Sequence, residues 1–438
     1  MFSTLWQRLL RALYSAVMYA LVPVMLYHLV WRGLHDRNDF RRWSERFGWY
    51  GGSGLCESLW LHAVSVGEVN AAAPLIDALR AAYPGRAIVI TTITPTGSAR
   101  VQALWGERVR HLYLPYDLPG AVRRFLRHID PRLALVMETE IWPNLYLGTH
   151  ARGIPLMLIN ARLSQRSGSG YRPVLPLIRL AMGRVDLIAA QTEADARRLR
   201  AVGARAARIR IIGNLKYDLR LPDGLDAQAR RWRAGWNSAR PVWIAASTHE
   251  DEERLVLDVH GALRIRFPDL LLLWAPRHPD RFGTVAEQAQ LHGLRVRTRS
   301  VHQLPAIDTD CFVLDSMGEL LAFYAAADVA FVGGSLQAIG GHNVLEPAAL
   351  GVPSIVGPHT FNFVEATALL RDDGALLQVE NVAGLEAALA LLLDDTPRRR
   401  AMGAAGRLAV ERERGALVRT MQLIAELLPP EKAEKGSE

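Results

Sequence analysis

Two series of short apolar runs constrain the fold of this chain more than any other feature of its sequence. In each series, an apolar run typical of a buried strand is followed by a turn and then by a stretch with helical spacing. This alternation predicts parallel sheets with helices on both faces, because parallel strands need crossover connections. The runs that we interpret as strands are 59–65, 87–94, 109–115, 133–137, 155–160, 187–191 and 209–212, then 242–246, 270–275, 294–298, 311–314, 329–332, 353–356 and 376–379. We therefore expect an α/β protein with two Rossmann-like, doubly wound domains.

The domain border falls where the alternation stops. A length of 438 residues favours two domains, and residues 217–237 contain a Leu-Pro-Asp-Gly turn and a charged helix instead of another strand. We expect residues 34–220 and 221–412 to form the two domains, with their strand ends facing one another across a cleft. The final helical stretch begins near residue 397, and its part 413–428 is expected to pack back on the first domain. Residues 429–438 are expected to be a disordered tail.

An apolar stretch near the N-terminus, Leu13 to Trp31, is just long enough to cross a bilayer. Its flanking arginines are Arg8 and Arg11 on one side and Arg32, Arg37, Arg41, Arg42 and Arg46 on the other. The heavier flank follows the stretch, which predicts that the main body stays in the cytoplasm. Pro23 and His28 are unusual in a spanning helix, and a buried core helix is an alternative. We expect residues 1–33 to be a membrane-anchor helix that either spans the bilayer or lies in its plane.

The net charge of the chain indicates which classes of partner it can bind. The formal net charge is +8 and is carried almost wholly by arginine, which leaves a basic surface suited to anionic lipids or phosphorylated substrates. No nucleic-acid partner is expected, because the sequence has no basic helix, zinc-ligand spacing or aromatic-basic RNA motif. Cys56 and Cys311 form no metal-binding pattern and indicate a reducing compartment.

Residues 328–359 have the pattern of a nucleotide-binding loop. An apolar run ends at the glycine pair 333–334, and a second pair, 340–341, precedes a helix expected to begin at Val344. Two glycine turns at a helix N-terminus let the backbone approach a ligand, with unpaired N–H groups facing it. Glu346, in the first helical turn, could accept the hydroxyl groups of a ribose. Asn343 and Glu346 also fit a capping box, which needs no ligand.

Carboxylates follow two runs of the first series. Glu68 lies at the end of HAVSVGE (62–68), where Gly67 allows a tight turn and a carboxylate could remove a proton from an attacking hydroxyl. A glutamate stabilised by the helix dipole is the alternative. Glu138 and Glu140 follow the fourth run, where two glutamates indicate a polar site or a salt bridge to arginine. The turn 94–98 also suits an anionic or sugar ligand, although Thr96 and Ser98 could equally be helix caps.

The second half offers cationic and backbone donors at its strand ends. Arg277 can pair bidentately with phosphate, and the turn 315–320 offers backbone N–H groups. Lys216, in a body that otherwise uses arginine, is a candidate point charge at the cleft, with chance as the alternative. Asp308-Thr309-Asp310 spells the D-x-D of metal-dependent sugar transferases but precedes its strand, so we interpret it as a solvated loop and predict no metal site.

Together these segments closely resemble the 3-deoxy-D-manno-octulosonic acid (Kdo) transferases, the lipid A glycosyltransferases of Gram-negative bacteria. The resemblance covers nearly the whole chain, and its specificity comes from the number and order of the motifs. They are HAVSVGE (62–68), TTITPTGSARV (91–101), YLPYDLP (113–119), METEIWPN (137–144), NARLS (160–164), STHEDEE (247–253), APRHPDRF (275–282), DSMGEL (315–320), FVGGS (331–335), GGHNVLEPAA (340–349) and GPHTFNF (357–363).

The resemblance implies a GT-B fold, in which an N-terminal domain binds the acceptor and a C-terminal domain binds the nucleotide sugar. It implies inverting transfer of Kdo from CMP-Kdo to a hydroxyl of the tetra-acylated lipid A precursor (lipid IVA), in lipopolysaccharide biosynthesis. No metal or cofactor is implied. The location implied is the cytoplasmic face of the inner membrane.

The same resemblance assigns roles to residues. Glu68 matches the general base, and Glu138, Glu140 and Lys216 match positions that stabilise the transition state, with Glu138 preferred over Glu140. The residues that match the CMP-binding segments are Pro276, Arg277, Met317, Gly318, Glu319, Asn343, Val344, Leu345 and Glu346. Further expected substrate contacts are Ser65, Gly67, Thr96, Gly97, Ser247, Thr248, Gly334, Gly341 and His342.

Two other functions are compatible with the residues alone. One is a GT-B transferase or epimerase that uses a uridine nucleotide sugar, which preference for UDP over CMP would reveal. The other is a non-catalytic, membrane-bound sensor of sugar nucleotides, which would bind a CMP-sugar without consuming it.

Overall fold

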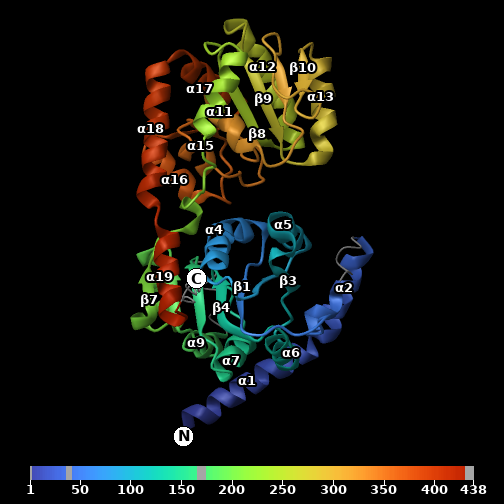
Figure 1. Ribbon diagram of the computed structural model, residues 1–438, viewed down its shortest axis with the longest axis vertical. Helices are drawn as coiled ribbons and strands as arrows, with labels where there is room; N and C mark the ends of the chain where they lie inside the picture. The colour runs from blue at the N-terminus through green and yellow to red at the C-terminus, as the bar shows by residue number, and fades with distance from the viewer. Residues whose placement is uncertain (1, 36–41, 165–173, 430–438) are drawn as a thin grey trace, which may run out of the picture. The chain divides into compact units, whose positions relative to one another are not determined.

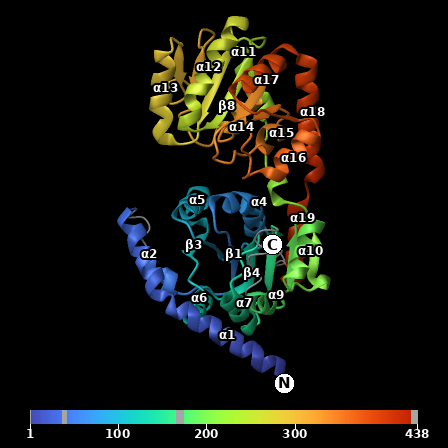
Figure 2. The same ribbon diagram turned by 180° about the vertical axis from the view of Figure 1, so that it is seen from behind.

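The computed structural model describes residues 2–35, 42–164 and 174–429 (Figure 1, Figure 2). The chain divides into two compact units, Met1–Asp218 with Arg414–Glu438 (unit 1) and Leu219–Glu413 (unit 2). Each unit contains one seven-stranded sheet within the described residues, and each strand pairs in parallel with its neighbours. The prediction of two doubly wound α/β domains is confirmed. The unit border lies two residues from the expected one, and the expected disordered tail falls outside the described residues from residue 430 onward.

Unit 1 has the strand order β3-β2-β1-β4-β5-β6-β7. Its strands are β1 Ser58–His62, β2 Ile88–Thr92, β3 Arg110–Tyr113, β4 Pro131–Met137, β5 Leu156–Ala161, β6 Leu187–Ala190 and β7 Ile209–Ile211. Its α-helices are α1 Phe2–Ala20, α2 Val22–His35, α4 Val66–Ala82, α5 Pro95–Trp105, α6 Pro119–Ile129, α7 Pro143–Ala151, α9 Leu175–Met182, α10 Glu193–Ala201 and α19 Ala416–Leu427. Short 3₁₀ turns are η1 Trp43–Phe47, η2 Gly106–Arg108, η4 Ala206–Arg208 and η5 Leu215–Tyr217.

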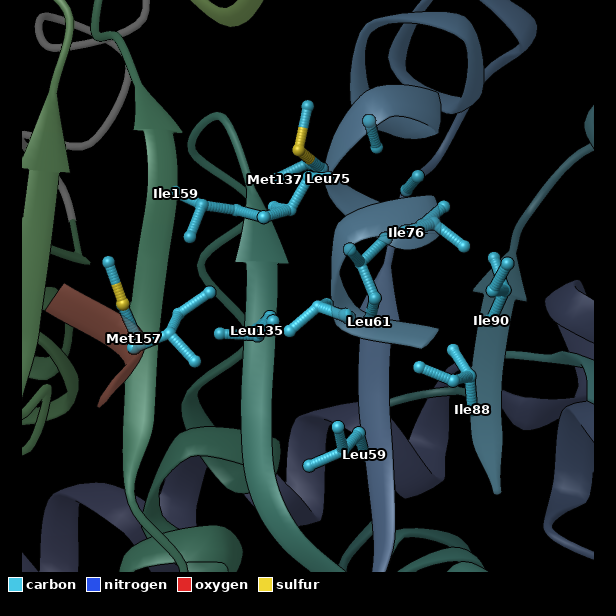
Figure 3. Packing of buried hydrophobic residues seen from close by; sticks show 14 of the residues in the cluster. Leu59, Leu61, Leu75, Ile76, Ile88, Ile90, Leu135, Met137, Met157 and Ile159 are labelled. Atoms are coloured by element: carbon cyan, nitrogen blue, oxygen red, sulfur yellow. The ribbon is translucent and has the colours of Figure 1, made fainter. Parts of the chain in front are cut away.

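The core of unit 1 explains why its central strands are apolar throughout. Both faces of the sheet are covered by helices, so β1 and β4 are buried along almost their whole length. On one face, α4 places Leu75 and Ile76 against Leu61 of β1 and Leu135 of β4 (Figure 3). This packing fixes the C-terminal ends of β1 and β4, where the candidate catalytic residues follow.

The N-terminal apolar stretch forms α1 and α2, and Leu5–Trp31 is long and apolar enough to cross a membrane by length and composition. The helices do not lie apart from the domain, since α1 contacts α7 and α9 (Figure 1, Figure 2). Little of the apolar window is buried. The prediction of an apolar N-terminal helix is confirmed; Arg37 and Arg41 of its expected basic flank lie outside the described residues.

The C-terminal segment differs from the single long helix expected from residue 397. The helix α18 ends at Glu413, and α19 begins after Gly415, whose φ of 99° is a conformation that glycine adopts without strain. Asp218 fixes this break, because its carboxylate accepts N–H groups from Gly415 (2.8 Å) and Leu417 (2.7 Å). α19 then contacts α4, and its Leu423 and Ile424 join the core of unit 1.

Unit 2 also has a seven-stranded parallel sheet, but its strand order, β10-β11-β9-β8-β12-β13-β14, differs from that of unit 1 because β11 lies between β10 and β9. Its strands are β8 Val242–Thr248, β9 Leu271–Pro276, β10 Val296–Thr298, β11 Cys311–Val313, β12 Val329–Val332, β13 Ser354–Val356 and β14 Leu376–Gln378. Its helices are α11 Leu225–Gly235, α12 Glu250–Arg266, α13 Phe282–Leu291, α14 Leu320–Ala326, α15 Leu345–Ala349, α16 Val364–Asp372, α17 Val382–Asp394 and α18 Thr396–Glu413, with the 3₁₀ turn η6 Pro279–Arg281. Each of the fourteen expected runs coincides with a strand, and no strand end differs by more than three residues.

Candidate functional site

The candidate catalytic residues of unit 1 lie where its strand order reverses. β1 pairs with both β2 and β4, so the chain moves outward from β1 in one direction and later continues from β4 in the other. In doubly wound sheets, ligands bind outside the strand C-termini at this switch point. Glu68 follows β1, and Glu138 and Glu140 follow β4, so the topology alone brings the three glutamates to one place.

Glu68 is the third residue of α4 and takes part in a reciprocal cap. The Ser65 hydroxyl accepts the N–H of Glu68, while the Glu68 carboxylate accepts the N–H of Val64 at 2.9 Å and the Ser65 hydroxyl at 3.2 Å. Burial raises the pKa of the Glu68 carboxyl to about 7, and the charges of Glu138 and Glu140 add to the rise, whereas the Val64 N–H opposes it. A carboxylate with a pKa near neutrality suits a general base. Glu68 therefore lies at the helix N-terminus and caps it, as the alternative interpretation placed it, and this position is compatible with catalysis.

Gly67 does not form the expected tight turn. It lies within α4, and a Cβ there would meet only the Ser65 hydroxyl oxygen at 3.8 Å, an ordinary contact. That prediction is wrong, because the chain turns before Gly67, at the extended residue Ser65.

The Glu138–Glu140 turn is held in an unusual backbone conformation. Glu138 has a φ of 52°, which costs a residue other than glycine about 1–2 kcal/mol. Its carboxylate pairs with Arg162 at 2.8 Å, and the Thr139 hydroxyl donates to the Arg162 carbonyl oxygen. Burial raises the pKa of Glu140, with the Glu138 charge adding to the rise. The salt bridge to arginine is confirmed at Glu138, and a second, half-buried carboxylate, Glu140, lies two residues further on; the polar site stays a prediction.

Two other expected substrate contacts of unit 1, Thr96 and Gly97, lie in the first turn of α5. At the start of α5, Thr94 is the helix cap in place of Thr96 or Ser98, and its hydroxyl accepts the N–H of Gly97 at 3.1 Å. Gly97 is buried, and a Cβ there would lie 2.9 Å from the Thr94 hydroxyl oxygen, so glycine is required by packing. Thr96 is exposed and remains accessible to a ligand.

Lys216 lies in the short turn η5, which is fixed to the sheet of unit 1. Asn214 accepts the N–H of Lys216 at 3.0 Å, and the side chain of Asn160, next to the end of β5, accepts the N–H of Leu215 at 2.9 Å. The backbone of Lys216 is thereby placed on the C-terminal side of the strands, as expected for a residue that acts there.

In unit 2 the strand order reverses between β8 and β12, and one carboxylate joins their ends. Glu252, the third residue of α12, is fully buried and accepts N–H groups from Gly334 (2.7 Å), Ser335 (3.1 Å), Leu336 (3.0 Å) and His249 (3.2 Å). The expectation that the first glycine turn presents unpaired N–H groups to a ligand is therefore wrong. An internal carboxylate already occupies those donors.

The space in front of this turn contains three histidines and an arginine. His249 and His342 lie 2.9 Å apart between their Nε2 atoms with parallel rings, and His278 meets His249 edge-on. Gly334 makes room for this pair, because a Cβ there would lie 3.0 Å from the His342 ring. Burial, together with the nearby charge of Arg277, lowers the pKa of His342 to about 4. The backbone N–H of Arg277 donates to the Thr248 carbonyl oxygen at 2.9 Å, but its guanidinium has no hydrogen-bond or ion-pair partner among the described residues, and the residue is half-buried, so the guanidinium is available to an anion.

In the turn Met317-Gly318-Glu319, the first two residues are exposed and the Glu319 carboxylate is ion-paired. Met317 is exposed, and Gly318 has a φ of 89°, which allows its backbone to face outward. Glu319 is ion-paired with Arg299 at 2.6 Å, which lowers the pKa of its carboxyl. A ligand would therefore meet the backbone of this turn more readily than the Glu319 carboxylate.

The helix after the second glycine pair is short, and it begins at Leu345 instead of Val344. Asn343 accepts the N–H of Leu345 at 3.1 Å and donates to the Glu346 carboxylate at 3.0 Å. The side chains of Val344 and Leu345 are buried, so only their backbones could touch a nucleotide. Gly341 is fixed by its N–H bond to the Gly334 carbonyl oxygen at 2.7 Å.

Of the other expected substrate contacts of unit 2, two are buried and one is half-buried. Thr248 is buried, and its hydroxyl accepts the indole N–H of Trp274 at 2.9 Å, so it is not accessible to substrate. Ser247 has a φ of 56° and is half-buried. Pro276, the last residue of β9, is buried and leads directly into Arg277.

The Asp308–Asp310 segment is not the solvated loop that was expected. Asp310 is buried and pairs with Arg264 at 2.9 Å and with Arg295 at 2.8 Å. In the described ranges, no group of three or more His, Cys, Asp or Glu side chains is arranged to hold a metal ion.

Three residues that support the candidate sites were not predicted from the sequence: Glu252, Asp117 and Arg162. Glu252 occupies the third position of its helix, as Glu68 does, and that spacing could have identified it as a capping carboxylate. Asp117 and Arg162 lie in recognised motifs, but their partners are 27 and 24 residues away along the chain, a distance at which spacing carries no signal.

Two parallel-sheet α/β units with polar residues at both switch points are the architecture of the GT-B class. Residues 41–219 match the family described as 3-deoxy-D-manno-octulosonic-acid transferase (kdotransferase), and residues 299–409 match glycosyl transferases group 1. The chain is 40% identical to the 3-deoxy-D-manno-octulosonic acid transferase of Haemophilus influenzae, over 94% of this chain and 98% of the relative. It is 37% identical to that of Bordetella pertussis, over 95% and 99%. The chain belongs to the Kdo transferase family.

A solved structure agrees at the level of the fold. A glycosyltransferase from Rickettsia africae superimposes with a TM-score of 0.54 and 14% identity, covering 87% of this chain and 100% of that one. The resemblance inferred from the motifs is confirmed by the family match and by the two relatives.

Proposed function

We propose that this enzyme transfers Kdo from CMP-Kdo to a hydroxyl of the tetra-acylated lipid A precursor, with inversion at the anomeric carbon. Glu68 acts as the general base, and the observation that carries this assignment is its carboxyl with a pKa of about 7 beside two further glutamates. At neutral pH a large part of such a group is ionised and can take up a proton.

In the proposed step, the acceptor hydroxyl oxygen attacks the anomeric carbon while Glu68 accepts its proton. The bond between the anomeric carbon and the CMP phosphate oxygen breaks, and the electron pair leaves with CMP. Positive charge develops on the sugar, and Glu138 or Glu140 stabilises it electrostatically. We prefer Glu138, because Arg162 and the turn fix its carboxylate in place. Lys216 stabilises charge in the same transition state.

Unit 2 holds the leaving group in this proposal. The Arg277 guanidinium, which has no hydrogen-bond or ion-pair partner among the described residues, binds the phosphate, and the backbone turn at Gly318 approaches the nucleotide. Asn343 and Glu346, now bonded to each other, exchange that contact for the ribose hydroxyls. Because CMP carries one phosphate, its departure produces less charge than a nucleoside diphosphate would, and protein cations suffice without a metal ion.

We also propose that α1 and α2 anchor the enzyme at the cytoplasmic face of the inner membrane. The outward side chains of this segment include Trp6, Leu9, Leu13, Val24 and Trp31, all exposed. An in-plane position is favoured over a spanning one, because the opposite face of α1 is bonded to the domain.

The test is incubation of the full-length protein in detergent with CMP-Kdo and lipid A precursor, followed by mass spectrometry of the lipid. We expect a product heavier by one or more Kdo residues, formed in the presence of EDTA. The variant Glu68→Ala should still bind CMP while losing at least about 100-fold in transfer. Competition that favours UDP over CMP, or binding of CMP-Kdo without its consumption, would refute the proposal in favour of the uridine-nucleotide or sensor alternatives.

A further inference from the structure

The N-terminal helix α1 has two faces with different chemistry. Side chains that point away from the domain are exposed and apolar, among them Leu9 (62% exposed) and Leu13 (64%). The half-buried side chains recur every three or four residues, as expected for one face of a helix. They are Gln7, Leu10, Arg11, Tyr14, Ser15 and Met18. A membrane requires only the first face, so the polar residues of the second face need another explanation.

Three of those side chains bond to two buried residues of the domain. Arg11 Nε donates to Asn144 Oδ1 at 3.1 Å, and the Ser15 hydroxyl reaches the same oxygen at 3.2 Å. The Tyr14 hydroxyl donates to Asp117 Oδ2 at 3.0 Å. Asn144 and Asp117 are 0% and 1% exposed, so α1 completes the hydrogen bonding of groups that water does not reach.

Asp117 in turn fixes the start of α7. Its two carboxylate oxygens accept the N–H groups of Asn144 and Leu145, each at 2.8 Å, and the Asn144 side chain donates to the Asp117 carbonyl oxygen at 2.8 Å. These bonds satisfy donors that a helix N-terminus leaves without internal partners. Asp117 therefore ties the loop before α6, the first turn of α7 and the docked face of α1 into one network.

The first turn of α7 continues directly into the Glu138–Glu140 turn. Only Ile141 and Trp142 separate Glu140 from Pro143, the first residue of α7. The Tyr146 hydroxyl, one turn into the helix, donates to the Glu140 carbonyl oxygen at 2.7 Å. The Glu138–Glu140 turn is thus held at one end by β4 and at the other by α7, and α1 lies against α7 (Figure 1, Figure 2).

We propose that Asp117 and Asn144 are positioning residues that couple the docking of α1 to the placement of Glu138 and Glu140. This rests on the proposed role of these two glutamates. The N-terminal helix then has two separable functions. Its outward face binds the membrane, and its inward face completes the support of the catalytic turn, so turnover depends on the helix even without a membrane.

The test compares the two faces in the full-length enzyme. The inward variant is Tyr14→Phe/Ser15→Ala, and the outward control is Leu9→Ser/Leu13→Ser. In detergent, we expect the inward variant to lose roughly tenfold in kcat with unchanged KM for CMP-Kdo, the scale of a slightly misplaced catalytic group. We expect its acidic pH limb to move downward, because the pKa of Glu68 depends on the charges of Glu138 and Glu140. The outward control should keep its kcat and lose binding to anionic phospholipid vesicles.

Amide hydrogen exchange over residues 138–146 provides a readout that does not depend on activity. Faster exchange there in the inward variant alone supports the coupling. An inward variant that is merely less stable, with unchanged kcat, pH profile and local exchange, overturns it. If Glu138→Gln and Glu140→Gln both retain normal kcat, the proposed role of the glutamates fails, whereas the exchange result still decides whether α1 positions the turn.

Discussion

Both units place a glutamate after the first strand of their sheet, beside the point where the strand order reverses, but the two glutamates have opposite environments. Glu68 and Glu252 are each the third residue of the helix that follows the central strand at the switch point, β1 in unit 1 and β8 in unit 2. Each carboxylate accepts a backbone N–H from the residues just before its helix, Val64 in one case and His249 in the other. Local sequence and local geometry therefore make the two residues equivalent.

The neighbouring strand makes them different. The segment after β12 offers Glu252 three further N–H groups from residues 334–336, which satisfy the charge in a fully buried place. The segment after β4 instead brings Glu138 and Glu140 toward Glu68, and burial together with these charges raises its pKa to about 7. A capping glutamate becomes a structural anion where donors surround it and a candidate base where other carboxylates do.

The largest effect is expected at Glu252. The substitution Glu252→Gln places an amide NH₂ against backbone N–H groups and removes the charge, so buried donors lose their acceptor. At about 1–3 kcal/mol for each such donor, we expect a loss of about 3–5 kcal/mol in the free energy of unfolding. Urea denaturation measures it, with Glu68→Gln as the matched control. A loss below about 1 kcal/mol at Glu252 would show that the N–H groups find other partners and that the contrast is overstated.

For the transfer rate, in contrast to stability, the larger loss is expected at Glu68. Glu68→Gln keeps the size and the cap of Glu68 but cannot accept a proton, so kcat should fall at least about 100-fold, equivalent to about 2.7 kcal/mol of activation free energy. Radiolabelled or mass-spectrometric assay of Kdo transfer in detergent measures it, while CMP affinity serves as the control for folding. Retention of more than a tenth of the wild-type rate would remove Glu68 from the mechanism.

The neighbouring carboxylates predict a shift in the pH profile. A base with a pKa of about 7 gives a transfer rate that falls about tenfold for each pH unit below that value. Because Glu138 and Glu140 raise the pKa, neutralising either of them should move the inflection to lower pH. The rate profile of Glu138→Gln or Glu140→Gln between pH 5 and 9, read as relative rates, tests this. An inflection that stays in place in both variants would mean that burial alone sets the pKa.

Much of this architecture follows from the sequence, for a physical reason. Parallel strands buried on both faces must be apolar along their length, so the strand positions were visible as runs, and the polar turn after each run marked the ligand-binding edge. Glu68, Glu138 and Arg277 were found in this way. A helix boundary differed from the prediction where a side chain far away in sequence sets it. Asp218, for example, fixes the break at Gly415 between α18 and α19.

Two of the errors came from groups whose partners are distant along the chain. The glycine turn 333–334 has the composition of a nucleotide loop, but Glu252, about 80 residues earlier, fills its donors. Asp310 lies in a motif that reads as a solvated loop, yet Arg264, Arg295 and burial determine its state. A local pattern shows that donors or charges exist, whereas only the fold shows whether a ligand or the protein itself satisfies them.

The last effect concerns the pH dependence of stability, and it distinguishes the two glutamates most sharply. The pKa of Glu68 is raised above its unfolded value of about 4.3, so the folded protein binds more protons than the unfolded chain between about pH 4 and pH 7. Stability contributed by this group is therefore lost as the pH rises through that window. Glu68→Gln should be more stable than wild type at pH 8, with the gain vanishing below about pH 4. Urea denaturation at a series of pH values measures the difference. A Glu68→Gln variant that is less stable than wild type at pH 8 would place Glu68 with Glu252, as a carboxylate kept for the fold and not for proton transfer.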